Sequence, residues 1–124
     1  MITPKEAKTL NDAYSARHTL ISNQITKRPD NRSTWFSLEE INLFLQYAKD
    51  QAKELGYELD GIRVYCGAYP DEGEQVGLST AFLIPTTSGG LGKDGNGGGS
   101  PDIPGANGLN RGSQGDPPGA NYPQ

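Results

Sequence analysis

His18 and Cys66 are the residues of this 124-residue chain that could supply a base and a nucleophile. A thiol activated by an imidazole can attack a substrate when a third group orients the base. No third group stands out in the sequence, and Cys66 falls in an alternating apolar stretch, where cysteine behaves as a small hydrophobic residue. His18 lies beside the apolar stripe of an expected helix. We therefore interpret both residues as structural and predict no catalytic residue.

Acidic residues raise the separate question of a metal site. A predicted loop carries Asp71, Glu72 and Glu74, whose carboxylates suit hard cations, but a solvated acidic turn explains them better. The stretch KDGNGGGSPD begins like a calcium-binding loop. The pattern then fails, because Gly105 stands where the bidentate glutamate is required. The sequence predicts no metal and no other cofactor.

Arg63, Tyr65 and Tyr69 are the strongest candidates for a binding surface. Their spacing places them together on one face of a predicted strand, where rings and a guanidinium could stack on a base or another ring. The formal net charge of −4 weighs against a nucleic-acid partner. A covering helix or another subunit explains the same residues, because aromatic residues and arginine concentrate in protein interfaces. We favour the interface.

Two helices should precede this strand. Residues 2–25 begin with Thr3, Pro4 and Glu6, which form a capping box with proline at the first helical position. Residues 35–56 carry a second capping box, formed by Ser37 and Glu40, and an apolar face with 3- and 4-residue spacing. That face comprises Ile41, Phe44, Ala48, Ala52 and Leu55, and Gly56 is a natural C-terminal cap.

Two strands should follow in residues 61–85, separated by the polar loop PDEGEQVG. In the first strand we expect Ile62, Val64, Cys66 and Ala68 on the apolar face, and in the second Leu78, Thr80, Phe82 and Ile84. The predicted fold class is α+β, with two helices packed on a small antiparallel hairpin. A lone hairpin leaves both edges unpaired. A strand from a second copy, a strand from a partner, or part of the tail should complete the sheet.

The chain should divide into a compact body, residues 1–87, and an extended tail, residues 88–124, that is rich in glycine, proline and asparagine. The tail carries few apolar residues, among them Ile103, Leu109 and Tyr122. This pattern suits a strap whose isolated apolar side chains enter pockets on a folded surface. We expect these three residues to contact a partner or a second copy.

Several stretches together resemble a group of small uncharacterised proteins from Bacteroidota bacteria. They are TPKEAKTL, STWFSLEEI, DGIRVYCGAYP, GLSTAFLIPT and the ending GDPPGANYPQ. The resemblance implies a bacterial, cytoplasmic setting and a tail that belongs to the protein, and it transfers no site residue. The lone cysteine and the lack of a signal-peptide-like or membrane-spanning apolar run also predict a cytoplasmic protein without membrane insertion.

Two functions are consistent with the sequence. The first is a non-enzymatic interaction or assembly protein that binds a protein partner or itself through its sheet edge and its strap-like tail. The alternative is a small ligand-binding domain or enzyme that uses the Arg63, Tyr65 and Tyr69 face. We favour the first hypothesis.

Overall fold

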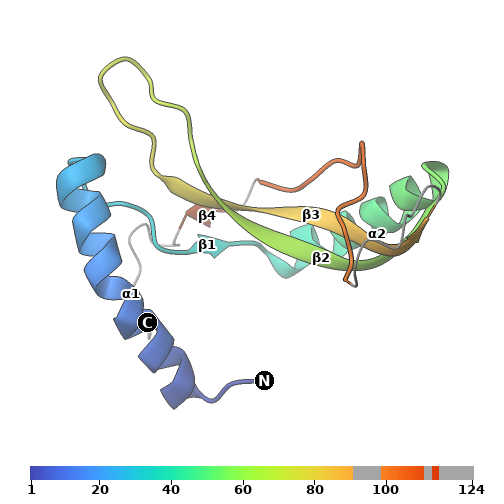
Figure 1. Cartoon of the computed structure of the whole chain (residues 1–124), viewed down its shortest axis with the longest axis horizontal. Helices are drawn as coiled ribbons and strands as arrows, with labels where there is room; N and C mark the ends of the chain where they lie inside the picture. The colour runs from blue at the N-terminus through green and yellow to red at the C-terminus, as the bar shows by residue number, and fades with distance from the viewer. Residues whose placement is uncertain (91–98, 111–112, 115–124) are drawn as a thin grey trace. The chain divides into compact units, whose positions relative to one another are not determined.

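A computed structural model describes residues 1–90, 99–110 and 113–114 of the chain. The elements follow in the order α1 (Pro4–Leu20), the π-helical turn η1 (Ile21–Ile25), β1 (Thr34–Trp35), α2 (Leu38–Glu54), β2 (Tyr57–Ala68), β3 (Ser79–Gly90) and β4 (Ser113–Gln114). The predicted α+β class is confirmed (Figure 1). No helix in the described ranges combines the length and the apolar character needed to cross a membrane.

The helix boundaries follow from their capping residues. The Thr3 hydroxyl accepts from the Glu6 N–H, and the Glu6 carboxylate accepts from the Thr3 N–H, so the first predicted capping box is complete. At α2 the Ser37 hydroxyl accepts from the Glu40 N–H. Gly56 follows the end of α2 with a φ of 87°, a left-handed conformation that favours glycine. Both helix starts are therefore encoded locally.

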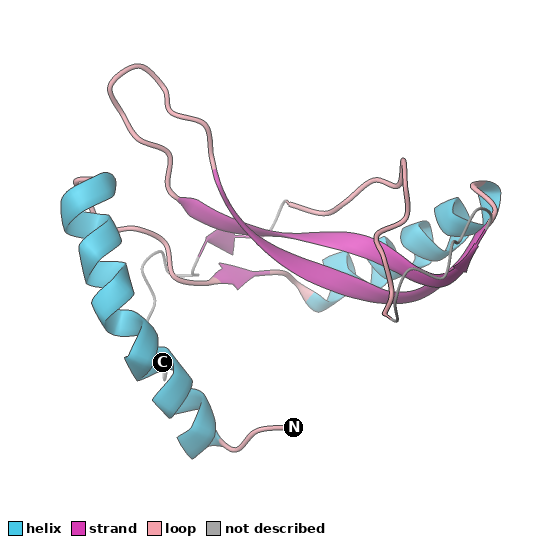
Figure 2. Cartoon of the chain, in the orientation of Figure 1, coloured by secondary structure: helices cyan, strands magenta, loops and turns pink. Residues whose placement is uncertain are grey.

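The strands form two antiparallel pairs of unequal length (Figure 2). β2 and β3 are the long pair, and the Tyr69 N–H bonds to the Leu78 carbonyl just beyond their ends. The short pair joins β1 to β4, with Thr34 opposite Gln114 and Trp35 opposite Ser113. The boundary expected between the compact body and the tail, after residue 87, falls inside β3.

The internal contacts divide the chain into two units. The first contains residues 1–35 and 66–81 together with β4, and the second contains residues 36–65 and 82–110. In the second unit Phe44 and Ala48 of α2 pack with Leu83 of β3, and these residues form the centre of the core. Phe36, Leu59, Ile62 and Leu109 pack around it.

The apolar face predicted for the hairpin is wrong over much of its length. Val64 is 65% exposed, and Cys66 and Ala68 are also exposed, whereas Tyr65 of the opposite set is half-buried. On β3 the core residue is Leu83, which the alternation had placed on the outer face. Simple alternation failed because it assumed that only one face of the hairpin is covered, whereas Leu83 packs against α2 on one face and Tyr65 is half-buried on the other.

α1 also differs from expectation, because none of its residues is buried. Its apolar stripe therefore provides no core within the described residues. Hydrogen bonds connect it to the rest of its unit, including those from the Arg32 guanidinium to the carbonyl and the side chain of Asn11 at 3.0 and 2.9 Å. The same guanidinium lies over the ring of Tyr14, 5.6 Å from its centroid.

Candidate functional site: a strap on the edge of the hairpin

Residues 99–110, here called the strap, run antiparallel along the edge of β3 that faces away from β2. Leu83 and Leu109 exchange both of their backbone hydrogen bonds at 2.9 Å. The Ile103 N–H bonds to the Pro85 carbonyl at 3.0 Å. Part of the tail thus completes one edge of the sheet, which was one of the three predicted solutions. Pro85 has no N–H to return to the strap, so this position contributes only its carbonyl to the pairing.

Apolar side chains hold the strap against the second unit. Ile103 is only 3% exposed, and Leu109 packs against the core cluster. Gly108 allows the close approach, because a Cβ atom there would lie 2.6 Å from the Leu83 carbonyl oxygen and from Ile84 Cδ1. The two strap residues predicted to contact a partner are therefore in contact with their own chain.

Two carboxylates, those of Asp102 and Asp60, accept hydrogen bonds that hold the strap on the hairpin. Asp102 accepts from the Arg63 guanidinium at 2.5 Å and from the Tyr65 hydroxyl. The same guanidinium donates to the Ser100 carbonyl at 2.8 Å. The ring of Tyr65 stacks on Phe82 with centroids 5.2 Å apart. Arg63 and Tyr65, predicted as a binding face, thus bind the strap of the same chain.

The second carboxylate belongs to the hairpin. Asp60 accepts from the Thr86 hydroxyl at 2.6 Å and from the Ser100 hydroxyl. At the far end of the strap, Asn107 donates its N–H to Gln51 and its amide to Tyr47, both at 2.7 Å. Sequence reasoning missed these partners, because they lie 26 to 60 positions apart along the chain.

The two remaining predicted residues lie elsewhere. Tyr69 belongs to the first unit, where its hydroxyl accepts from Thr80 at 3.1 Å, so Tyr69 is not part of the strap attachment. Tyr122 lies outside the described residues. The predicted set of six residues is therefore brought together in part, as Arg63, Tyr65, Ile103 and Leu109.

Hydrogen bonds shift the pKa values of the side chains that hold the strap. Hydrogen bonds from Ser100, and then from Thr86 and Ser88, lower the pKa of Asp60. Donation to Asp102 raises the pKa of the Tyr65 hydroxyl, and the same carboxylate raises the pKa of Arg63. The attachment therefore favours ionised Asp60 and protonated Tyr65.

We expect the strap to detach at both extremes of pH. Because the pKa of Asp60 is lowered by folding, its contribution is present above the unfolded value of about 4 and is lost as the pH falls through the folded value. Because the pKa of Tyr65 is raised, its contribution is present below about 10 and is lost as the pH rises through the folded value. The Ile103 methyl resonances report both transitions in an NMR titration.

Two variants separate the transitions. Asp60→Asn should remove the acid-dependent change of the Ile103 signals, and Tyr65→Phe should remove the alkaline one. Ile103 signals that titrate identically in both variants and in the unaltered chain would show that neither group controls the strap.

Two serines, a histidine and an aspartate also meet in the first unit, but their geometry is not that of a catalytic triad. The Asp30 carboxylate accepts from the N–H and hydroxyl of Ser79, at 2.7 and 2.5 Å. Only the backbone of Asp30 contacts the other two residues: its carbonyl bonds to His18 Nε2 at 2.7 Å, and its N–H donates to Ser22 Oγ at 2.9 Å. The carboxylate thus does not orient the imidazole, as a triad requires.

Among the described residues, Cys66 makes no hydrogen bond with His18, whose Nε2 bonds to the Asp30 carbonyl instead. Cys66 is exposed and lines a pocket of about 280 Å³, whose other lining residues include Tyr14, Arg32 and Ser79 but not His18. Within the described ranges, no three His, Cys, Asp or Glu side chains gather as they would around a metal ion. Comparison of the chain with protein-family models, with curated proteins and with solved structures finds no match.

Proposed function

We propose that this chain is a non-enzymatic assembly protein that pairs with a second copy of itself along the free edge of β2. The observation that carries the proposal is that only one of the two edges of the β2–β3 hairpin is paired within the described residues. The strap occupies the β3 edge, whereas within the described residues no strand pairs with the other edge of β2. An extended segment of a different protein on the same β2 edge is the alternative occupant.

The free edge offers regular backbone groups. In an antiparallel pair, successive residues point their N–H and C=O groups alternately toward the partner strand and away from it. The hydrogen bond of Tyr69 with Leu78 and the stack of Tyr65 on Phe82 set the register of β2 against β3. By this alternation Ile62 and Val64 direct their backbone groups to the free edge, and such edges readily accept another strand.

A second copy is the favoured occupant because it completes the sheet symmetrically. Antiparallel pairing of two β2 strands about a two-fold axis would place the strands in the order strap, β3, β2, β2, β3, strap. The outer edge of each hairpin would then be the β3 edge, which the strap of the same chain already covers. A two-fold interface uses the same surface on both copies, and it leaves no further β2 edge to recruit a third.

The distribution of apolar side chains in the second unit also favours an assembly. Val64 is 65% exposed on β2, and α2 exposes Leu38, Leu43, Leu45 and Tyr47. The buried apolar residues described for this unit include two alanines, so its core is small. Exposed apolar area of this kind is typical of an interaction surface.

The alternative of a ligand-binding or enzymatic Arg63, Tyr65 and Tyr69 face receives less support. The polar groups of Arg63 and Tyr65 are engaged by Asp102, and Tyr69 contacts Thr80 instead. A ligand at this face would have to displace the strap. We also propose a cytoplasmic location, in which the single Cys66 would remain a free thiol.

Val64→Pro tests the proposal. Proline removes the N–H that Val64 directs to the free edge, while an edge strand tolerates proline where the N–H faces solvent. We expect a dimer in sedimentation equilibrium for the unaltered chain and a monomer with an unchanged circular dichroism spectrum for Val64→Pro. Val64→Thr, which keeps the N–H and the β-branched shape, should remain a dimer.

Two outcomes would contradict the proposal. An unaltered chain that is monomeric at all concentrations would exclude self-pairing. A Val64→Pro variant that remains folded and dimeric would place the dimer contact elsewhere.

A further inference from the structure

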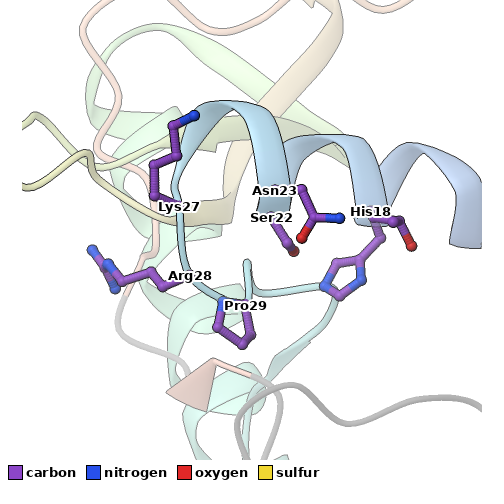
Figure 3. A pocket seen from close by; sticks show the side chains of 7 residues that line it. His18, Ser22, Asn23, Lys27, Arg28 and Pro29 are labelled. Carbon is purple, nitrogen blue, oxygen red and sulfur yellow. The ribbon is translucent and has the colours of Figure 1, made fainter.

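A pocket of about 520 Å³ lies in the first unit where the N-terminal helix ends, and the proposed pairing does not use it. Its walls are formed by His18, Thr19, Ser22, Asn23, Lys27, Arg28 and Pro29. Figure 3 shows His18, Ser22 and Asn23 projecting from the end of the helix, and Lys27, Arg28 and Pro29 from the turn that follows it. The pocket is therefore built from one continuous segment of the chain.

This segment is basic in an acidic protein. Residues 17–32 contain four of the eleven lysines and arginines of the chain but only one of its fifteen acidic residues. The acidic residue is Asp30, which is completely buried and has both carboxylate oxygens hydrogen-bonded to Ser79. No carboxylate lines the pocket. The local charge therefore attracts anions although the whole chain carries −4.

Several donors on the wall have no partner in the part of the chain that the structure describes. The ammonium group of Lys27 and the amide of Asn23 make no hydrogen bond or ion pair with a described residue. Ser22 Oγ accepts from the Asp30 N–H, so its own proton can be donated to a ligand. These groups could all donate to the oxygen atoms of one anion.

The end of a helix would ordinarily repel an anion, because its last carbonyl groups are unpaired. Here carbonyls around the turn are engaged. The Ile21 carbonyl accepts from the Thr26 N–H at 2.8 Å, and the Arg28 carbonyl accepts from the Thr26 hydroxyl at 2.6 Å. The Asp30 carbonyl bonds to His18 Nε2 at 2.7 Å. These contacts reduce the negative potential that the turn would otherwise present.

The turn also adopts costly conformations. Lys27 has a φ of 59°, the left-handed region in which a lysine is less stable than a glycine. Arg28 donates Nη2 to the Val76 carbonyl, but its buried Nε has no hydrogen-bond partner among the described residues. A π-helical turn precedes both residues. Such features concentrate at functional sites, where a specific side chain outweighs the local cost.

The geometry points to this pocket as a binding site for a small oxyanion, a phosphate or carboxylate group, that Lys27 contacts through its ammonium and that Ser22 and Asn23 contact through hydrogen bonds. This assignment explains why a lysine occupies a position at which glycine would be more stable. It is independent of the pairing proposed for β2.

Thermal unfolding in inorganic phosphate, with sodium chloride at the same ionic strength as the reference, tests the assignment. Phosphate should raise the melting temperature of the unaltered chain above that in chloride. Acetate in a parallel series distinguishes a carboxylate site from a phosphate site, because a carboxylate site would respond equally to acetate.

Lys27→Gly should have two opposite effects: a higher melting temperature in chloride and loss of the phosphate-dependent increase. Asn23→Asp, which places a negative charge in the pocket without altering the turn, should also lose the increase. Lys5→Ala removes a positive charge from the same helix outside the pocket, and it should retain the increase. The assignment is overturned if the unaltered chain shows no difference between phosphate and chloride, or if Lys27→Gly and Asn23→Asp retain the full increase.

Discussion

Phe44→Ala is expected to lower the free energy of unfolding by about 3 to 5 kcal/mol. Phe44 is 7% exposed and joins α2 to β3 through Leu83. Its removal loses the burial of a large ring and leaves a cavity that the small alanines beside it cannot fill. Urea unfolding followed by circular dichroism measures the change.

Leu43→Ala is the matched control, because Leu43 is the preceding residue of α2 and is 65% exposed. It should change stability by less than about 1 kcal/mol if the side chain has no buried contact. Equal losses for the two variants would mean that the core does not form on the Phe44 face of α2.

Ile103→Ala is expected to cost about 2 to 5 kcal/mol, although the residue lies in a segment dominated by glycine, proline and asparagine. Ile103 is 3% exposed, and its N–H bonds to the Pro85 carbonyl. Truncation of its side chain removes the most deeply buried apolar contact of the strap. Pro104→Ala, a change at the exposed neighbouring residue, is the control and should be nearly neutral.

Urea unfolding again gives the stability change, and the Ile103→Ala variant should also show faster amide exchange at Leu109. A loss confined to the strap, with the stability of α2 unchanged, would mean that the strap opens independently of the core. No loss at all would contradict the buried position of Ile103.

The helices could be predicted from the sequence because their signals are local. Thr3 and Ser37 cap their helices through residues three positions away, so neither start depends on the rest of the fold. The face of α2 was also correct, since Phe44, Ala48 and Ala52 are its buried residues. The hairpin was located correctly for the same reason, because its alternation and polar loop are local patterns.

The sequence could not predict which hairpin residues are buried and which are exposed, because their burial depends on the strap. Asp102 lies 39 positions from Arg63 and 37 from Tyr65, and no local pattern pairs them. Once Asp102 engages these residues, their side of β2 is partly covered and Val64 is left exposed. Separation in sequence also hid the role of Asp30, which lies in the polar run KRPDNRS but is completely buried and hydrogen-bonded to Ser79, 49 positions away. In the sequence alone, a buried carboxylate that accepts two hydrogen bonds cannot be distinguished from an exposed carboxylate of a polar loop.

Amide hydrogen exchange at Ile62 and Val64, measured over a range of protein concentrations, tests the proposed pairing of β2 most directly. These N–H groups point to the free edge in a single chain, whereas those of Arg63 and Tyr65 point toward β3 by the alternation of an antiparallel pair. We predict slow exchange at Arg63 and Tyr65 at every concentration, and exchange at Ile62 and Val64 that slows as the concentration rises. Fast exchange at Ile62 and Val64 at all concentrations, with Arg63 and Tyr65 protected, would contradict the pairing.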